Sequence, residues 1–284
     1  MIVEDPVSGT VKNTSMRNKK VGVVILTYNR LHFLKICLCK VLAQTYDKME
    51  VVVVDNNSKD GTREYLNEQE GVQKIFLKEN SGPAGGFYAG IKYVTEELDV
   101  DYLWLMDDDF FPFNSCLENL IKNVNEDMMV FPYVREKNFA TQRKPGWWGV
   151  LLPTQIIKKV GYPRMDLFFW SEDTEYLQAR IIQKFKFRQK WVASAKGVHF
   201  TVRKTNYRQP WRYYYEIRNT IYSRLYIKET TGLRIYKLFK TWVKLFGNIL
   251  LKENEKMEKM LWFFRGTNDG IFKKLGKRKE LHKE

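Results

Sequence analysis

Residues 102–113 read Tyr-Leu-Trp-Leu-Met-Asp-Asp-Asp-Phe-Phe-Pro-Phe, an apolar run that stops abruptly at three carboxylates. A buried strand would carry the apolar part and end in a crevice of its sheet, holding Asp107, Asp108 and Asp109 together. Because adjacent carboxylates repel one another, a hard divalent cation with positions left for water and phosphate would relieve the repulsion. The segment predicts a metal-assisted enzyme, and a solvated acidic turn without a ligand is the alternative interpretation.

The composition indicates a globular protein with a substantial core. The chain has 284 residues, 44% of them hydrophobic, which allows one or two domains. Cys37, Cys39 and Cys116 form no C-x-x-C pair, so neither a disulfide framework nor a zinc ribbon is indicated. The first twenty residues lack the apolar segment of a signal peptide, and no apolar run approaches the ~18 residues that span a bilayer. We therefore expect a cytoplasmic protein.

The excess of positive charge points to an anionic partner, which could be nucleic acid, a nucleotide or a membrane surface. The formal net charge is +15. Residues 233–284 contain 14 Lys or Arg and 6 Asp or Glu, a net charge of +8. More than half of the excess therefore lies in the last fifth of the chain.

Apolar runs and helical patterns alternate along the first 110 residues. The runs lie at 21–26, 51–54, 74–77 and 102–107, and the helical patterns at 31–45, after Gly61, and at 84–98. This order predicts crossover units, and hence an α/β fold with a Rossmann-like, mostly parallel sheet flanked by helices. We expect a flexible lead at 1–20, a catalytic domain at 21–205 and a basic, aromatic, helical C-terminal region at 206–284.

Polar segments follow four of these strands, and the carboxyl ends of parallel strands share one edge of a sheet, where ligands bind. Asp55 suits a sugar hydroxyl or a base N–H there, although an Asp in such a turn can also bond its own backbone. A glycine-rich turn before the helix at 84–98 would allow an anion to approach the backbone, but it matches neither the dinucleotide nor the P-loop pattern. The segments contain Thr27, Tyr28, Asn29, Arg30, Asp55, Asn56, Asn80, Gly82, Gly85, Gly86 and the three aspartates.

A second acidic segment, residues 168–175, reads Phe-Phe-Trp-Ser-Glu-Asp-Thr-Glu and opens a helix near Ser171. Ser171 is a good N-cap, and acidic residues in a first turn are favoured by the helix dipole without any catalytic role. The aromatic residues before it indicate instead a walled pocket in which a carboxylate acts as general base. Both interpretations stay open.

Two further features have a structural and a functional interpretation each. His199 lies beside apolar residues, where a histidine is more often structural, but its imidazole would complete an aspartate-rich Mn²⁺ site. Trp147 and Trp148 could pack in the core, or one could provide a face on which a sugar ring stacks.

Six motifs in order and spacing resemble the family 2 inverting glycosyltransferases of GT-A fold, and most of all the bacterial galactofuranosyl- and rhamnosyltransferase branch. They are residues 23–30, 53–58, 80–86, 106–109, 148–149 and 170–175. The resemblance covers about residues 21–200, and residues 265–270 are similar to a C-terminal element of that branch.

The resemblance implies a UDP- or dTDP-linked sugar donor bound along residues 27–30, 55–56 and 82–86, in contact with Asp107 and Asp108. It also implies a Mn²⁺ or Mg²⁺ ion whose ligands are Asp107, Asp109 and His199. By the same resemblance the base would be Asp173, with Glu172 beside it. We expect Trp147, Trp148 and Glu175 to bind the acceptor. Galactofuranosyltransferases of this type usually have aspartate where this chain has Glu172, so the sugar stays open.

The same resemblance implies a glycan or lipid-linked acceptor in bacterial cell-surface polysaccharide synthesis. Residues 238–246 alternate apolar and basic side chains, which suits a helix in an anionic membrane interface. A helix packed on the catalytic domain is the alternative. We expect a peripheral enzyme on the inner face of the cell membrane.

Two other classes compete with this interpretation. A nucleic-acid-binding protein would explain the basic charge and interleaved aromatic residues but not the acidic edge, so we expect no nucleic-acid partner. A nucleotidyltransferase would need a basic triphosphate-binding loop after the first strand, where Arg30 is the only charged residue.

Overall fold

The computed structural model describes residues 18–136, 141–142, 144–200, 208–227 and 231–281. Most of the expected flexible lead, and the expected domain boundary after residue 205, lie outside the described residues. The chain divides into two compact units, each described by itself below. Unit 1 comprises Met1–Asn80, Gly86–Tyr162 and Ile181–Thr201, and unit 2 comprises Ser81–Gly85, Pro163–Arg180 and Val202–Glu284.

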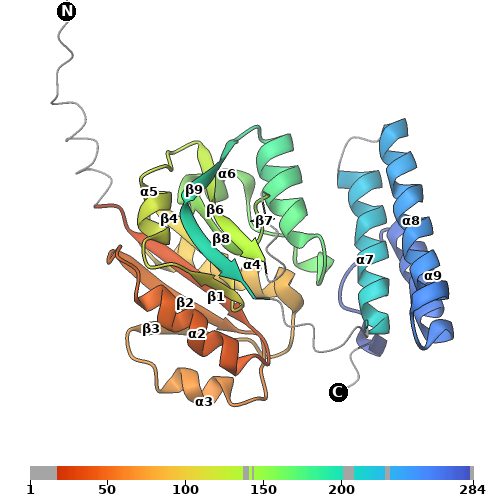
Figure 1. Ribbon diagram of the computed structural model, residues 1–284, viewed down its shortest axis with the longest axis horizontal. Coiled ribbons are helices and arrows are strands. Elements are labelled where there is room, and N and C mark those ends of the chain that lie inside the picture. Colours follow the sequence, from red (N-terminus) through yellow and green to blue (C-terminus); the bar gives the residue numbers. More distant parts are fainter. Residues whose placement is uncertain (1–17, 137–140, 143, 201–207, 228–230, 282–284) are drawn as a thin grey trace, which may run out of the picture. The chain divides into compact units, whose positions relative to one another are not determined.

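Four parallel strands form the first half of the sheet in unit 1 (Figure 1). Their order is β3-β2-β1-β4, and all three neighbouring pairs are parallel. The strands are β1 (Val21–Thr27), β2 (Met49–Asp55), β3 (Val72–Phe76) and β4 (Tyr102–Asp107). These are the four runs that the sequence predicts as strands, and their parallel arrangement is confirmed.

The second half of the sheet mixes parallel and antiparallel pairs. β8 (Trp148–Pro153) is antiparallel to β4 and to β6 (Met128–Glu136), and β9 (Arg188–His199) is parallel to β6. β5 (Phe110–Pro112) is antiparallel to β9, and β7 (Thr141–Gln142) to β6. The α/β class is confirmed, and the sheet, which the sequence predicts to be mostly parallel, is parallel in its first half and mixed in its second.

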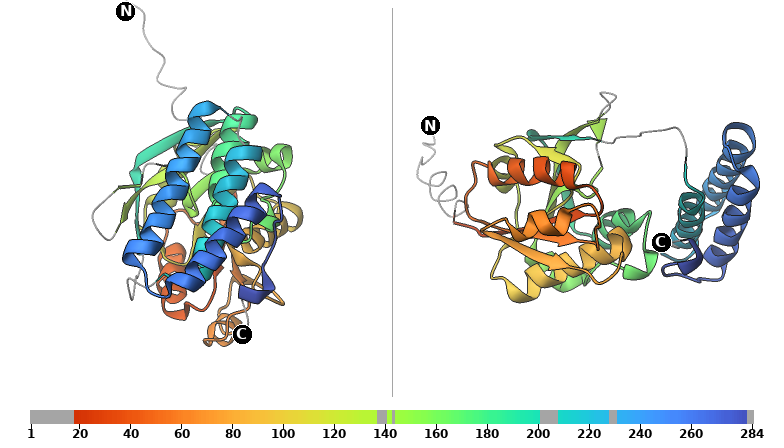
Figure 2. Two further views of the ribbon diagram at one scale, coloured as in Figure 1. Left: turned by 90° about the vertical axis from the view of Figure 1, so that its right-hand side faces the viewer. Right: turned by 90° about the horizontal axis from the view of Figure 1, so that it is seen from below.

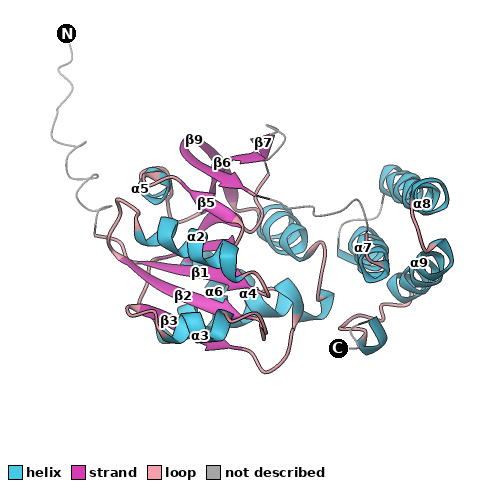
Figure 3. Ribbon diagram, turned by 60° about the horizontal axis from the view of Figure 1, so that its bottom comes forward, coloured by secondary structure: helices cyan, strands magenta, loops and turns pink. Residues whose placement is uncertain are grey.

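Helices cover both faces of this sheet (Figure 3). On one face, α2 (Leu31–Leu42), α3 (Thr62–Asn67) and α5 (Cys116–Ile121) contribute buried side chains to one hydrophobic cluster with β1, β2 and β4. On the other, α4 (Gly82–Glu97) packs closely, because a Cβ on Gly86 or Gly90 would overlap Leu26 or Val24. A further helix, α6 (Thr154–Val160), follows β8.

The register of the parallel strands places their carboxyl ends at one edge. Thr27 at the end of β1 pairs with Asp55 at the end of β2, and Leu26 pairs with Asp107 at the end of β4. The edge predicted to gather polar segments therefore exists, and it positions the candidate site.

Unit 2 is helical, and three of its helices share a core (Figure 2). They are α7 (Pro210–Tyr222), α8 (Gly232–Lys252) and α9 (Lys256–Ile271). Unit 2 also contains the 3-10 turns η1 (Met165–Leu167) and η4 (Lys279–Leu281) and the π-helix η3 (Ser223–Ile227). The π-helix η2 (Thr174–Lys184) begins in unit 2, and its last turn belongs to unit 1. In the stretches described, no helix is both long and apolar enough to cross a bilayer.

Glycines bring α9 against the backbone of α7. A Cβ on Gly266 would lie 2.5 Å from the Tyr214 carbonyl oxygen, and one on Gly270 would lie 2.7 Å from the Arg218 carbonyl oxygen. Both belong to the 265–270 motif noted in the sequence. The glycines of that motif therefore have a packing role, which is to allow close contact between the two helices.

We expect the same substitution to have opposite effects at two helical glycines. Gly90→Ala places a methyl group 2.5 Å from Val24 Cγ1, and overpacking of this kind destabilises by about 1–3 kcal/mol. Gly247→Ala in α8 meets no atom within 4 Å, so the better helix propensity of alanine should stabilise by about 0.5–1 kcal/mol. Urea unfolding followed by circular dichroism measures both, and changes of the same sign would contradict the packing assigned to Gly90.

Candidate active site

The turn between β4 and β5 carries an acidic pair that is buried and neutralised by Arg30. Asp108 is 2% exposed and Asp109 is 6% exposed. Arg30 Nη1 lies 3.2 Å from Asp108 Oδ1 and 2.6 Å from Asp109 Oδ2, and Thr27 Oγ1 donates to Asp108 Oδ2 at 2.7 Å. The polar residues at the end of β1 therefore contact the acidic residues that follow β4, as the sequence predicts for strand ends at one edge.

His199 closes the other side of this cluster. Its Nε2 lies 3.3 Å from Asp109 Oδ1, and its Nδ1 lies 2.9 Å from Glu136 Oε1. Burial opposes a charged imidazole, but the hydrogen bonds and charges of Asp109 and Glu136 outweigh it and raise the pKa of His199 to about 9. Glu136 is absent from the sequence-based prediction. It faces His199 because β6 and β9 pair in register, for which the local sequence gives no signal.

The two buried aspartates have different protonation equilibria. Burial raises the pKa of Asp108 to about 7, against the opposing charge of Arg30. Burial acts in the same direction on Asp109, but hydrogen bonding and charge from His199, together with Arg30, lower its pKa. Asp109 is therefore the carboxylate that stays charged at neutral pH.

The chemistry of Asp109 and His199 fits a divalent cation. Asp109 Oδ1 is buried and has no hydrogen bond of good geometry, and a carboxylate with an imidazole nitrogen suits Mn²⁺. Within the described part of the chain, however, no three Asp, Glu, His or Cys side chains converge as metal ligands. The predicted set of Asp107, Asp109 and His199 is thus only partly brought together, with Arg30 against the carboxylate of Asp109.

The loops after β1 and β2 are tied to each other. Asn29 N donates to Ser58 Oγ at 2.8 Å, and Asp55 Oδ1 accepts from Ser58 N at 2.9 Å. Asp55 is fully buried, and its Oδ2 has no hydrogen-bond partner. Asn56 Nδ2 donates to Asn80 Oδ1 at 3.2 Å. Tyr28 in the same loop is half-buried. The buried oxygen of Asp55 is an acceptor that a ligand hydroxyl or N–H would satisfy.

The glycines predicted at the donor site have packing roles. Gly82 has a φ of +67°, and a Cβ there would lie 2.1 Å from the Phe168 carbonyl oxygen. A Cβ on Gly85 would lie 2.4 Å from Ser81 Cβ, and one on Gly86 would lie 2.3 Å from Leu26 Cδ1. Packing alone therefore explains why these positions have no side chain, and their anion-binding role stays a prediction.

The two adjacent tryptophans point into different surroundings. Trp147 is 3% exposed and stacks on Phe87 with ring centroids 4.2 Å apart, so it belongs to the core. Trp148 is half-buried, and its ring centroid lies 5.6 Å from that of His199. Trp148 is the tryptophan that lies beside the acidic cluster.

The second acidic segment belongs to unit 2 and precedes the π-helix η2. Glu172 is 7% exposed, and Asp173, which accepts from the Thr174 backbone N–H, is half-buried. Burial raises the pKa of Asp173 above its ordinary value, which favours proton uptake. Glu175 is 4% exposed, and both its carboxylate oxygens accept from Arg180 Nη2 at 2.8 Å. Its carboxylate is therefore committed to an ion pair.

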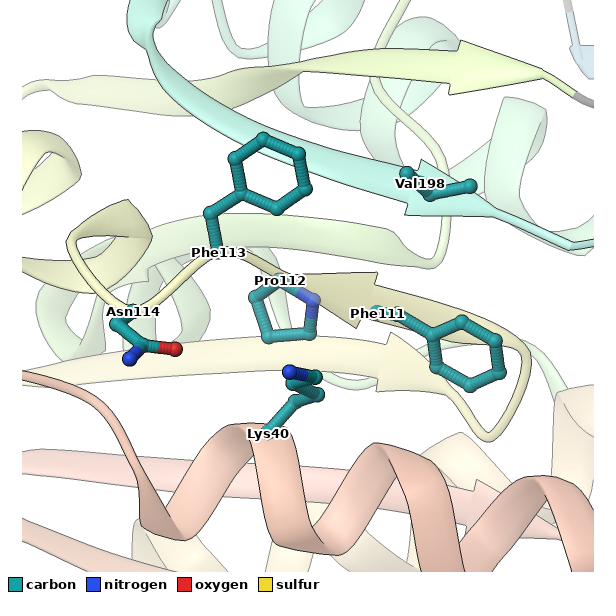
Figure 4. A pocket seen from close by; sticks show the side chains of 6 residues that line it. All are labelled: Lys40, Phe111, Pro112, Phe113, Asn114 and Val198. Carbon is teal, nitrogen blue, oxygen red and sulfur yellow. The ribbon is translucent and has the colours of Figure 1, made fainter.

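An open, mainly apolar pocket lies beside the strand pair that carries His199 (Figure 4). Phe111 and Val198, which line it, form the pair next to Phe110 and His199 in the β5–β9 register. Lys40 supplies the one cationic group of its lining. The pocket adjoins the acidic cluster along the strands but does not include it.

The sequence profile of glycosyl transferase family 2 matches residues 22–188, and the chain belongs to this family. An uncharacterized glycosyltransferase of Nostoc sp. is 34% identical over 93 residues, which cover 30% of this chain and 29% of the relative. The matched part thus spans less than a third of that relative.

Solved structures show the same fold. TarS of S. aureus in complex with UDP (residues 1–349) superposes with a TM-score of 0.60 at 16% identity, covering 89% of this chain and 80% of TarS. A mannosyltransferase from Pyrobaculum calidifontis in complex with GDP-Man and Mn²⁺ superposes with a TM-score of 0.56 at 11% identity, covering 90% of this chain and 88% of that one. The GT-A expectation for the fold is confirmed.

Removing the carboxylate of Glu136 should lower the pKa of His199. Glu136→Gln keeps the side-chain size but loses the charge that favours the imidazolium, so the pKa should fall below the value of about 9. NMR titration of the His199 imidazole in metal-free protein measures it. Glu126→Gln, which alters an exposed carboxylate, is the control, and an equal pKa in both variants would contradict the assigned contact.

Proposed function

We propose that this family 2 glycosyltransferase moves a sugar, with inversion, from a nucleotide diphosphate to a glycan or lipid-linked acceptor. The observation that carries the proposal is the cluster of Thr27, Arg30, Asp108, Asp109 and His199, joined by hydrogen bonds and ion pairs at the sheet edge. Support comes from the similar folds of TarS and the Pyrobaculum calidifontis mannosyltransferase, which were solved with UDP and with GDP-Man and Mn²⁺, respectively.

In this proposal Asp109 and His199 hold a Mn²⁺ or Mg²⁺ ion, with Asp107 as the further ligand. Bound there, the cation would offset the negative charge that grows on the departing diphosphate. The buried oxygen of Asp55 accepts from a hydroxyl or an N–H of the donor. Glu136 orients His199 by accepting from its second ring nitrogen, as outer carboxylates do for metal-binding histidines.

Asp173 is the proposed general base. It takes the proton of the acceptor hydroxyl as that oxygen forms its bond to the anomeric carbon, while the bond from that carbon to the diphosphate oxygen breaks. One displacement inverts the anomeric centre and needs no covalent intermediate. The raised pKa of Asp173 suits this role, whereas the ion pair with Arg180 removes Glu175 as a competing base.

For the donor we propose galactofuranose or rhamnose, in the synthesis of a bacterial cell-surface polysaccharide. The support is the resemblance of the motifs to that branch, with Glu172 as the departure. A panel containing UDP-galactofuranose, dTDP-rhamnose and UDP-GlcNAc, each with and without Mn²⁺, tests the choice by release of nucleotide diphosphate. Faster turnover of UDP-GlcNAc than of either favoured donor would overturn it.

Asp173→Asn should abolish transfer and leave nucleotide binding intact, because it removes the base but no group of the acidic cluster. General bases contribute about 10²–10⁴-fold to rate, so we expect a fall in kcat of that size with the Kd for UDP and Mn²⁺ within about twofold of wild type. Asp109→Ala is the matched variant, and it should weaken Mn²⁺-dependent UDP binding in calorimetry. Near-wild-type turnover of Asp173→Asn would disprove the base assignment.

We further propose that α8 and α9 bind an anionic membrane surface. Both helices leave apolar side chains exposed, and Phe264 of α9 contacts Trp242 and Phe246 of α8. We infer that seven of the exposed side chains form one surface, here called the α8–α9 apolar face. Lys240 and Lys244 come directly after Phe239 and Val243, two residues of this face in α8. Positive charge beside an apolar face suits anionic lipid head groups. The face consists of Tyr236, Phe239, Val243, Leu250, Met257, Leu261 and Phe264, each at least 40% exposed.

Charge reversal on this helix should release the protein from vesicles. Each lysine near an anionic surface contributes about 1 kcal/mol, so Lys240→Glu with Lys244→Glu should reduce flotation with phosphatidylglycerol vesicles at low salt by at least about 30-fold. Phe239→Ser should also weaken flotation, whereas Phe113→Ser, at an exposed phenylalanine of unit 1, should not. A wild-type protein that stays unbound would overturn the proposal.

A further inference from the structure

The segment that leads into the proposed base has an unusual backbone. Phe168, Trp170 and Ser171 have φ values of +60°, +74° and +68°. Such values lie in the left-handed region that residues with a Cβ rarely adopt, bulky ones least of all. Three of them within four positions persist only where the surroundings hold them, and such strain is concentrated at functional sites.

Asn219 of α7 supplies that restraint. It is fully buried, and its Nδ2 donates to the carbonyl oxygens of Leu167, Phe169 and Trp170 at 2.9, 2.7 and 2.8 Å. One side-chain amide therefore contacts three carbonyl groups of residues 167–170, of which only Leu167 belongs to a helical turn, η1. The segment ends two residues before Asp173.

Arg218 fixes the orientation of this amide. Its Nε donates to Asn219 Oδ1 at 2.8 Å, which requires that the amide nitrogen faces the loop. Its Nη2 donates to the Leu167 carbonyl at 2.8 Å, and its Nη1 to the Gly276 carbonyl at 2.6 Å. Arg218 is fully buried over the Tyr215 ring, 4.8 Å from its centroid. Its bond to the Leu167 carbonyl thus also holds the start of the loop.

The glycine-rich turn meets the same segment within unit 2. Ala84 N donates to the Phe168 carbonyl at 3.2 Å, and Gly82 lies too close to that oxygen for any side chain. The carbonyl of Ser171, the last residue of the segment, accepts from Glu175 N at 2.8 Å. All five carbonyls from Leu167 to Ser171 are therefore bonded, and these bonds restrain the backbone before Glu172 and Asp173.

We propose that Asn219, oriented by Arg218, is a positioning residue for Asp173, so that a helix of the C-terminal region sets the geometry of the proposed base. The inference rests on the function proposed above. Without the three bonds the left-handed residues relax toward extended backbone, and the Asp173 carboxylate moves. Misplacement of a reacting group by about 1 Å can cost about 10²-fold in rate.

Asn219→Ala in the full chain tests the inference, with Asn248→Ala in α8 as the matched control. We expect hydrogen–deuterium exchange of the amides at 168–173 to rise at least tenfold in Asn219→Ala only. With the best donor of the panel, kcat should fall about 10²-fold, while the Kd for UDP and Mn²⁺ stays within about twofold. Unchanged exchange, or equal losses in kcat and UDP binding, would overturn the inference.

A rescue variant separates strain from a general loss of structure. Glycine adopts a φ of +68° without a Cβ penalty, so Ser171→Gly added to Asn219→Ala should recover part of the lost kcat and lower the loop exchange. The double variant also serves as the test if Asn219→Ala alone does not fold. If its kcat and loop exchange equal those of Asn219→Ala, the result would count against the inference. If Asp173→Asn stays active, or no donor is turned over, the proposed function fails, and the exchange experiment still decides whether Asn219 holds the loop.

Discussion

The candidate site depends on the neutralisation of buried carboxylates at the end of β4. Asp108 and Asp109 are almost fully buried, and charges buried in this way are tolerated only where opposite charge and hydrogen bonds compensate them. Arg30 and His199 supply that compensation from strand ends far apart in the sequence. The pairing of the strands therefore stabilises the buried carboxylates, because it places the side chains of Arg30 and His199 beside Asp108 and Asp109. A divalent cation bound to Asp109 would act on the same charge, so it would compete with Arg30 and with the proton on His199.

The part of the fold that the sequence predicts is the part whose contacts are periodic and local. Four apolar runs became β1 to β4, and the helical patterns between them became α2, α3 and α4. Parallel crossover order then places Thr27, Asp55 and Asp107 at one edge without any knowledge of side-chain contacts. The antiparallel strands β5 and β8 escaped prediction, since β5 has three residues and β8 follows an irregular stretch.

The contacts that could not be predicted arise where distant segments meet. Glu136 reaches His199 through a parallel pairing of strands whose partner residues are 63 positions apart. Asn219 reaches the loop at 167–170 across about 50 positions. Neither residue stands in a recognisable pattern, and an asparagine in a helix normally signals only weak helix propensity. The glycines are a local pattern that has two explanations. A glycine-rich turn predicts an anion site, but close packing against Leu26 and Phe168 also requires glycine at these positions.

The composition of unit 2 changes the interpretation of the C-terminal helices. The acidic loop at 167–173 and the turn at 81–85 belong to the same compact unit as α7, α8 and α9, and α7 carries the side chains that bind the loop carbonyls. A membrane role for α8 and α9 would therefore be mechanically linked to the proposed base, because α9 packs on α7 through Gly266 and Gly270, where even a methyl group would overlap backbone. So close a contact transmits displacement rather than absorbing it. In the function proposed above, the surface that binds the membrane and the side chains that position the base therefore belong to one compact helical unit.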